Sequence, residues 1–243
     1  SSSGPAEPAA PACGRSERPV RPRHAPHLLR LQKNAVMTDS LDEKARFLVE
    51  TAPYRAFLYR FWRDFFLGRR DSGWRSRMPD ALKIAAVLAA GRDLPEETPL
   101  ANPLDGLAPA DIERPFAALF YGVGPETFPL TKSGAAAPGA LSAGPASARA
   151  HAVFRAHGLV LTGENLPEDH IGVSLEFLAQ LAEANHPHES PFLDEAVLSW
   201  LPSTLSAAGA STAGLALRPL FNAAIAALEA TDARLKERQP QRI

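Results

Sequence analysis

Apolar side chains recur at helical spacing through most of the chain after residue 40. The clearest stripe runs from Phe57 to Phe66 and consists of aromatic and leucine residues, with Arg60, Arg63 and Asp64 on the opposite face. Residues three or four apart lie on one side of an α-helix, so this stripe predicts an amphipathic helix that packs against a core.

The same spacing predicts helices over residues 41–48, 80–90, 111–121, 147–157, 171–185, 192–206 and 215–236. Pro53 is expected either to start a second helix or to bend the first, because its ring cannot follow a regular helix interior. Val, Ile and Thr never alternate over a useful length, and no Asn-Gly hairpin turn occurs. The pattern therefore predicts an all-α fold.

Two interior stretches interrupt the helical pattern. Residues 93–109 are rich in Pro and acidic residues and are predicted as a loop, and residues 122–146 hold so many Gly and Pro that they are predicted as a long loop or a linker. The helices on either side are expected to form two lobes, over about residues 37–133 and 146–240, joined by a Gly/Pro-rich linker at 134–145.

The first 36 residues differ from the rest, with Pro, Ser, Ala and Arg dominating and no apolar periodicity. Such a stretch buries too little surface to offset its ordering entropy, and it lacks the apolar core of a secretory signal. Residues 1–36 are expected to be a disordered or non-native segment. Met37 is expected to open the folded domain, over residues 37–243.

Composition excludes several classes of protein. A net charge of −1 over 243 residues argues against a chain-wide basic surface for nucleic acid. The single cysteine, Cys13, excludes an internal disulfide framework and a Cys-rich metal site. The longest apolar runs, such as Ile84 to Ala90, are too short to span a bilayer.

No stretch of the chain matches a catalytic or nucleotide-binding motif. Gly122-Val123-Gly124 begins like a dinucleotide loop but lacks the third glycine and follows a predicted helix. His186 and His188 could offer two imidazoles to a metal, but a turn between helices is the preferred interpretation because a closed zinc site needs four ligands. We expect no metal, no cofactor and no enzymatic activity.

The segment from Glu164 to Leu178 combines a short Pro-x-Asp-His loop with a helix that carries Leu-Glu-Phe. It resembles the signature of the TorD/DmsD-type redox-enzyme maturation chaperones, a family related to the NarJ group. Weaker similarities to the same family follow in the expected order, at Tyr54–Phe66, at Leu119–Gly124, and at Phe192 with Trp200-Leu201-Pro202. Together they cover roughly residues 54–206.

The resemblance implies a compact, two-lobed, TorD-like helical fold and a cytoplasmic chaperone. The implied partner is the precursor of a molybdopterin-dependent reductase or dehydrogenase, bound through its twin-arginine leader. The chaperone would hold the apoenzyme until the molybdenum cofactor is inserted and the enzyme is exported. Neither nucleic-acid binding nor stable membrane insertion is implied, and a homodimer formed by exchange of lobes stays open.

A leader carries an arginine pair followed by an apolar stretch, so its receptor needs carboxylates beside an apolar surface. The resemblance assigns leader binding to the residues of this loop and of an aromatic turn, namely Glu164, Pro167, Glu168, Asp169, His170, Phe120 and Tyr121.

Other interpretations of these residues stay open. Asp169 could simply cap the following helix, and His170 could be structural. Two rival functions remain. One is a nucleotide- or small-molecule-binding helical regulator, and the other is an enzyme in which His170, paired with Asp169, acts as a general base.

Overall fold

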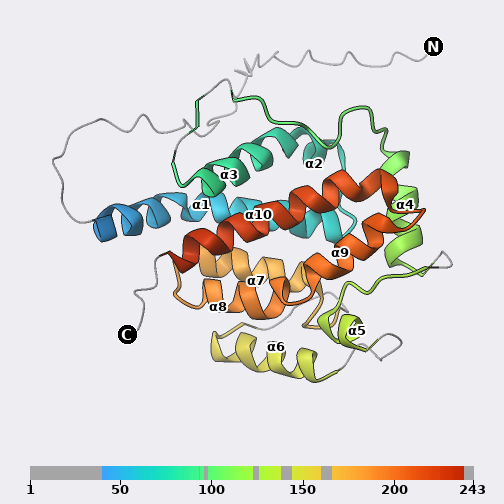
Figure 1. Ribbon diagram of the computed structural model, residues 1–243. Helices are drawn as coiled ribbons and strands as arrows, with labels where there is room; N and C mark the ends of the chain where they lie inside the picture. The colour runs from blue at the N-terminus through green and yellow to red at the C-terminus, as the bar shows by residue number, and fades with distance from the viewer. Residues whose placement is uncertain are drawn as a thin grey trace, which may run out of the picture. The chain divides into compact units, whose positions relative to one another are not determined.

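The computed structural model describes residues 40–92, 94–95, 98–122, 126–137, 144–159 and 166–237. These residues form helices and loops (Figure 1). The first long helices are α1 (Ser40–Phe66), α3 (Met78–Ala90) and α4 (Ala110–Phe120), with the short α2 (Ser72–Ser76) between α1 and α3. The later ones are α6 (Pro145–Ala156), α7 (Ile171–Glu183), α9 (Leu201–Ala210) and α10 (Arg218–Lys236).

Short helical segments join the later helices. They are α5 (Lys132–Ala136), α8 (Glu189–Leu193), the π-helical turn η1 (Asp194–Leu198) and the 3-10 turn η2 (Leu215–Leu217). The described residues contain no strand, and two segments meet in an isolated antiparallel bridge between Thr131 and His170. The predicted all-α class is therefore confirmed.

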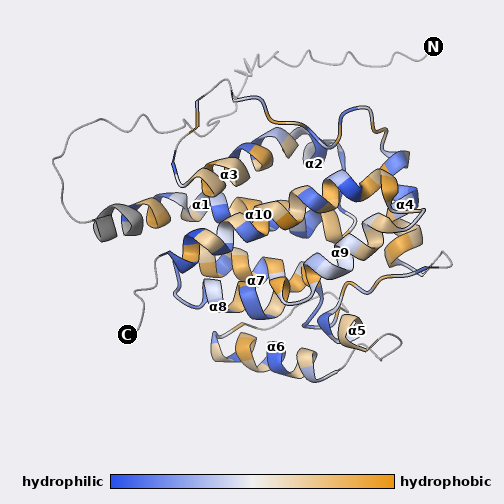
Figure 2. Ribbon diagram, in the orientation of Figure 1, coloured by the Kyte–Doolittle hydropathy of each residue, from blue (hydrophilic) through white to orange (hydrophobic). Residues whose placement is uncertain are grey.

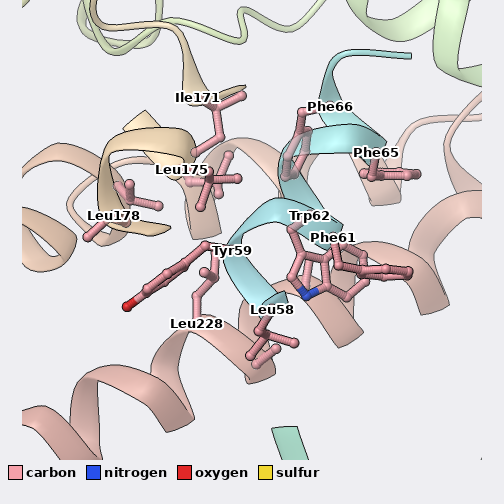
Figure 3. Packing of buried hydrophobic residues seen from close by; sticks show 14 of the residues in the cluster. Leu58, Tyr59, Phe61, Trp62, Phe65, Phe66, Ile171, Leu175, Leu178 and Leu228 are labelled. Carbon is pink, nitrogen blue, oxygen red and sulfur yellow. The ribbon is translucent and has the colours of Figure 1, made fainter. Parts of the chain in front are cut away.

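The apolar stripe predicted from Phe57 to Phe66 forms the centre of the core. Helix α1 contacts α7, α3 and α10, and α10 in turn contacts α3 and α9. Figure 3 shows Phe61, Trp62 and Phe65 on one side of α1 and Leu175 of α7 on the other. Figure 2 shows hydrophobic and hydrophilic residues alternating along these helices.

Pro53 lies inside α1, which is continuous from Ser40 to Phe66. The expectation that Pro53 starts a second helix is therefore wrong. Residues on both sides of the proline, including Leu48 and Leu58, are buried in the same core. Packing of the apolar stripe thus outweighs the hydrogen bond that the proline cannot donate.

A buried ion pair fixes α1 to the start of α8. Arg55 is completely buried, and its Nε and Nη2 donate to Oε1 and Oε2 of Glu189 at 2.9 and 3.0 Å. The Tyr59 hydroxyl donates to Glu189 Oε1 at 3.1 Å, and burial, together with the charge of Glu189, raises the pKa of Tyr59 well above its usual range. The guanidinium also donates to Leu48 O and Thr51 Oγ1, so several of its donors are satisfied.

The Gly/Pro-rich stretch differs in part from its prediction as an irregular loop. Within the described residues it contains α5, which Thr131 caps by accepting a hydrogen bond from the Gly134 amide. A capped single turn has too few apolar residues to show a helical period. The residue that its first turn binds, Asp169, lies 36 residues further along the chain. The two-lobe division with a linker at 134–145 stays a prediction, and the predicted N-terminal segment 1–36 lies outside the described residues.

Candidate functional site

The loop in front of α7 pairs with the segment in front of α5. The Lys132 amide donates to Asp169 O at 3.2 Å, and the Ile171 amide donates to Leu130 O at 2.9 Å. These bonds flank the bridge between Thr131 and His170. Two segments that lie about 40 residues apart in the sequence are thereby held side by side, each at the beginning of a helix.

Asp169 is buried, with 3% of its surface exposed. Its Oδ2 accepts a hydrogen bond of 2.7 Å from the Ser133 amide, in the first turn of α5. Its Oδ1 and the hydroxyl of Ser133 are both buried without a hydrogen-bond partner in the described part of the chain. Asp169 therefore caps a helix 36 residues earlier and not the following helix α7, whose N-cap is His170, so the capping alternative is wrong in the helix that it named. The other carboxylate oxygen keeps its acceptor capacity.

His170 is the N-cap of α7. Its Nδ1 accepts a hydrogen bond of 3.1 Å from the Gly172 amide, which satisfies one of the free donors at the start of the helix. A Cβ built on Gly172 would lie 2.5 Å from Leu67 Cδ2, so α7 begins in close contact with the residue after α1. The alternative that His170 has a structural role is thus supported by its position as the N-cap of α7.

Glu168 contacts α6. Its Oε2 accepts a hydrogen bond of 2.7 Å from the Ser147 hydroxyl, and its Oε1 lies 3.1 Å from His151 Nδ1. The hydrogen bond from Ser147, a backbone hydrogen bond and the neighbouring His151 lower the pKa of Glu168. Pro167 beside it is half-buried. Glu164, which was predicted to bind with these residues, lies outside the described part of the chain.

Phe120 and Tyr121 end α4. Phe120 packs against Phe116 and Phe221 with ring centroids 4.7 and 5.9 Å away, whereas Tyr121 is 56% exposed. The Tyr121 hydroxyl lies over Gly68, just after the end of α1. Because Leu67 contacts Gly172, the aromatic turn and the start of α7 both lie near the end of α1.

His186 and His188 lie in the turn between α7 and α8, as predicted, and pack against a third histidine. The ring of His157, just after α6, lies 5.1 Å from that of His186 and 5.2 Å from that of His188. Burial and the two neighbouring imidazoles lower the pKa of His188. The residues described contain no group of three or more His, Cys, Asp or Glu side chains that could hold a metal ion.

Sequence reasoning did not find the partners of the predicted loop. Ser133 reaches Asp169, and Ser147 and His151 reach Glu168, from segments that were predicted as a loop and as an ordinary short helix. Ser147 and His151 are four residues apart, on one face of α6. That spacing was readable from the sequence, but the acidic residue that it faces was not.

Comparison with known proteins gives one match. Residues 91–206 match the family model of the nitrate reductase delta subunit. The match includes α4–α8 and the loop with Pro167, Glu168, Asp169 and His170. No curated protein and no solved structure matches the chain. Among the described helices, none is both long enough and apolar enough to cross a bilayer.

The delta-subunit family comprises chaperones that mature molybdenum enzymes, and it is the group to which the TorD/DmsD-type proteins are related. The resemblance carried by the Pro-x-Asp-His loop is thus confirmed by an independent match over the same segment. Over residues 91–206, the chain is therefore similar to the NarJ/TorD-type family of redox-enzyme maturation chaperones.

Proposed function

We propose that this protein is a cytoplasmic chaperone for the precursor of a molybdopterin-dependent oxidoreductase. It binds the twin-arginine leader and the apo form of that enzyme and holds them until the cofactor is inserted, before export. The family match over residues 91–206 is the observation that carries this proposal, because it includes the acidic loop in front of α7. The chain acts by binding and needs no catalytic residue.

The chemistry of the loop supports leader binding. Glu168 and Asp169 are adjacent carboxylates, and Asp169 Oδ1 is a buried acceptor without a partner among the described residues. A buried carboxylate oxygen gains most from a charged donor, and a guanidinium can donate two parallel hydrogen bonds to it. Phe154 of α6, the helix that contacts Glu168, packs with the buried rings of Phe177 and Phe192, so apolar side chains for an apolar stretch lie near the loop.

Calorimetric titration of the intact chain with a synthetic leader peptide tests this function. The peptide carries an Arg-Arg pair followed by a roughly ten-residue apolar stretch. Asp169→Asn should weaken binding by about 1.5–3 kcal/mol, or about 10- to 150-fold, which is the scale of a hydrogen bond to a charged group. The melting temperature should change little, because the amide oxygen can still accept from the Ser133 amide.

Two controls accompany this titration. Replacing Arg-Arg by Lys-Lys in the peptide keeps the charge but removes the planar fork, and should also weaken binding. Glu183→Gln removes an exposed carboxylate at the far end of α7 that pairs with Arg60, and should leave the affinity unchanged. Absence of binding to the wild-type chain, or equal affinity of Asp169→Asn, would contradict the proposed role of this loop.

A further inference from the structure

Helix α6 lies over the loop that is proposed to bind the leader. Ser147 and His151 on its inner face contact Glu168, and Gly144, just in front of α6, lies against Ser133. A Cβ built on Gly144 would lie 2.7 Å from Ser133 Oγ, so the start of α6 closes tightly over the residue that binds Asp169. Ser133 Oγ, one of the two buried atoms without a partner in the described part of the chain, is thus covered by the residue in front of α6. The other, Asp169 Oδ1, belongs to the carboxylate that the Ser133 amide binds.

The contacts that hold α6 in place are few. Three of its residues are buried, namely Ser147, Ala150 and Phe154. Phe154 is the large apolar one, and its ring packs 4.8 Å from Phe177 and 6.1 Å from Phe192. The His151 side chain that meets Glu168 is 55% exposed, so solvent weakens this pair. Figure 1 shows α6 and α5 at the lower edge of the helices, beyond α7 and α8.

An element with so few buried contacts opens at a lower free energy than the core helices do. Opening of α6 would release Glu168, whose side chain is 29% exposed, from Ser147 and His151. It would also uncover the apolar faces of Phe177 and Phe192, which are 3% and 5% exposed while α6 is in place, and give ligands access to the Ser133 side of Asp169. The closed arrangement therefore occupies Glu168 and hides the apolar surface that a leader needs.

The inner face of α6 has the same chemical order as a leader. A hydroxyl and an imidazole, from Ser147 and His151, meet a carboxylate, and an apolar ring follows on the same face at Phe154. A twin-arginine leader likewise places cationic side chains before an apolar stretch. An arginine of the leader would supply a hydrogen-bond donor to Asp169 Oδ1. Among the described contacts, no residue of α6 supplies one.

We propose that α6 is a displaceable cover of the leader site, which occupies within the same chain the place of the arginine-and-apolar segment of the client. Binding of the leader releases α6 from Glu168, Phe177 and Phe192. This proposal rests on the leader binding proposed above and adds its regulation. The apparent affinity for a leader is then the intrinsic affinity reduced by the fraction of molecules in which α6 is open.

Phe154→Ala tests the cover in the intact chain. Loss of the aromatic contact favours the open form, so the Arg-Arg peptide should bind about tenfold more tightly by calorimetry. Phe57→Ala is the matched control, because the Phe57 ring packs against Phe61 within α1. It removes the same side chain from another contact and should change the affinity by less than about twofold. Unchanged or weaker binding by Phe154→Ala would overturn the proposal.

Hydrogen exchange on the wild-type chain gives a second test that needs no variant. A saturating concentration of the Arg-Arg peptide should speed exchange of the α6 amides, residues 145–156, and slow exchange in α7, residues 171–183. Slower exchange in α6 would mean that the leader binds on top of it and that α6 is no cover. A wild-type chain that binds no peptide would instead refute the proposed function itself, so the two failures are distinct.

Discussion

At the scale of single residues, the buried charges of Arg55 and Glu189 compensate each other in a direct ion pair. Arg55 and Glu189 are both almost inaccessible to solvent, at 0% and 1% exposure, and they join α1 to α8 through two parallel hydrogen bonds. Two charges taken out of water recover their solvation only through such direct pairing. Tyr59 donates a further hydrogen bond to the same carboxylate.

Glu189→Ala is expected to destabilise the protein by about 3–5 kcal/mol, because it leaves the Arg55 guanidinium buried without its counter-charge. Glu183→Ala serves as the control. It removes the partner of Arg60, whose side chains are 33% and 50% exposed, and should cost less than about 1 kcal/mol. Urea denaturation followed by circular dichroism measures both values. Equal losses in the two variants would show that the buried pair contributes no more than a surface pair.

Single residues are also where sequence reasoning reached its limit. The acidic loop could be singled out from its Pro-x-Asp-His pattern, but the burial of Asp169 could not, because the amide that it binds lies 36 residues away. Arg55 left a readable signal, since it interrupts the apolar stripe of α1 between Leu48 and Tyr59. The residue that pairs with such a charge is set by tertiary packing, and the periodicity of the sequence does not identify it.

At the scale of elements, apolar periodicity predicted the long helices and missed short ones such as α5. The stripe on α1 and the stripe on α7 meet in the structure, as a 3.6-residue period requires. The helix α5 has only five residues, and these include a lysine and a glycine, so the sequence shows no apolar stripe there. Pro53 shows the opposite case, in which a local signal for an interruption was overridden by burial on both sides.

Pro53→Ala is expected to stabilise the protein by about 1–2 kcal/mol, less than the roughly 3 kcal/mol cost of a proline in a helix interior because the unfolded chain also gains freedom. Pro202→Ala is the matched control. Pro202 lies in the first turn of α9, where its missing N–H would have no partner within the helix, so no gain is expected. Thermal melts report both changes. A loss of stability in Pro53→Ala would show that the proline sets a bend that the core requires.

At the scale of the whole molecule, the first and last helices are interleaved. α1 packs on α7, and α3 packs on α10, so the main contacts of these two long helices of the first half are with helices of the second half (Figure 1). Neither half encloses the aromatic core alone, since Phe65 and Phe120 from the first half pack with Phe221 from the second. Stability is therefore expected to be a property of the described residues 40–237 together.

The expected consequence is a single unfolding transition for the full chain. Trp62 and Trp74 report on the first half and Trp200 on the second, which allows the two to be observed separately. In Trp200→Phe, the fluorescence comes from the first half alone. Its midpoint in urea should coincide with the midpoint of the far-ultraviolet circular dichroism of the same variant, because the helices of both halves lose their shared core at once.

The complementary variant, with Trp62→Phe and Trp74→Phe together, reports on Trp200 alone and should show the same coincidence at its own midpoint. Comparing two probes within each variant removes the effect of the substitution on stability itself, including the hydrogen bond from Trp74 Nε1 to Phe61 O that the double variant loses. Separate midpoints for fluorescence and helix content would mean that two lobes unfold independently, on either side of the Gly/Pro-rich stretch. Coincident midpoints would mean that any motion involved in client binding is confined to smaller parts, such as α6, while the shared core stays folded.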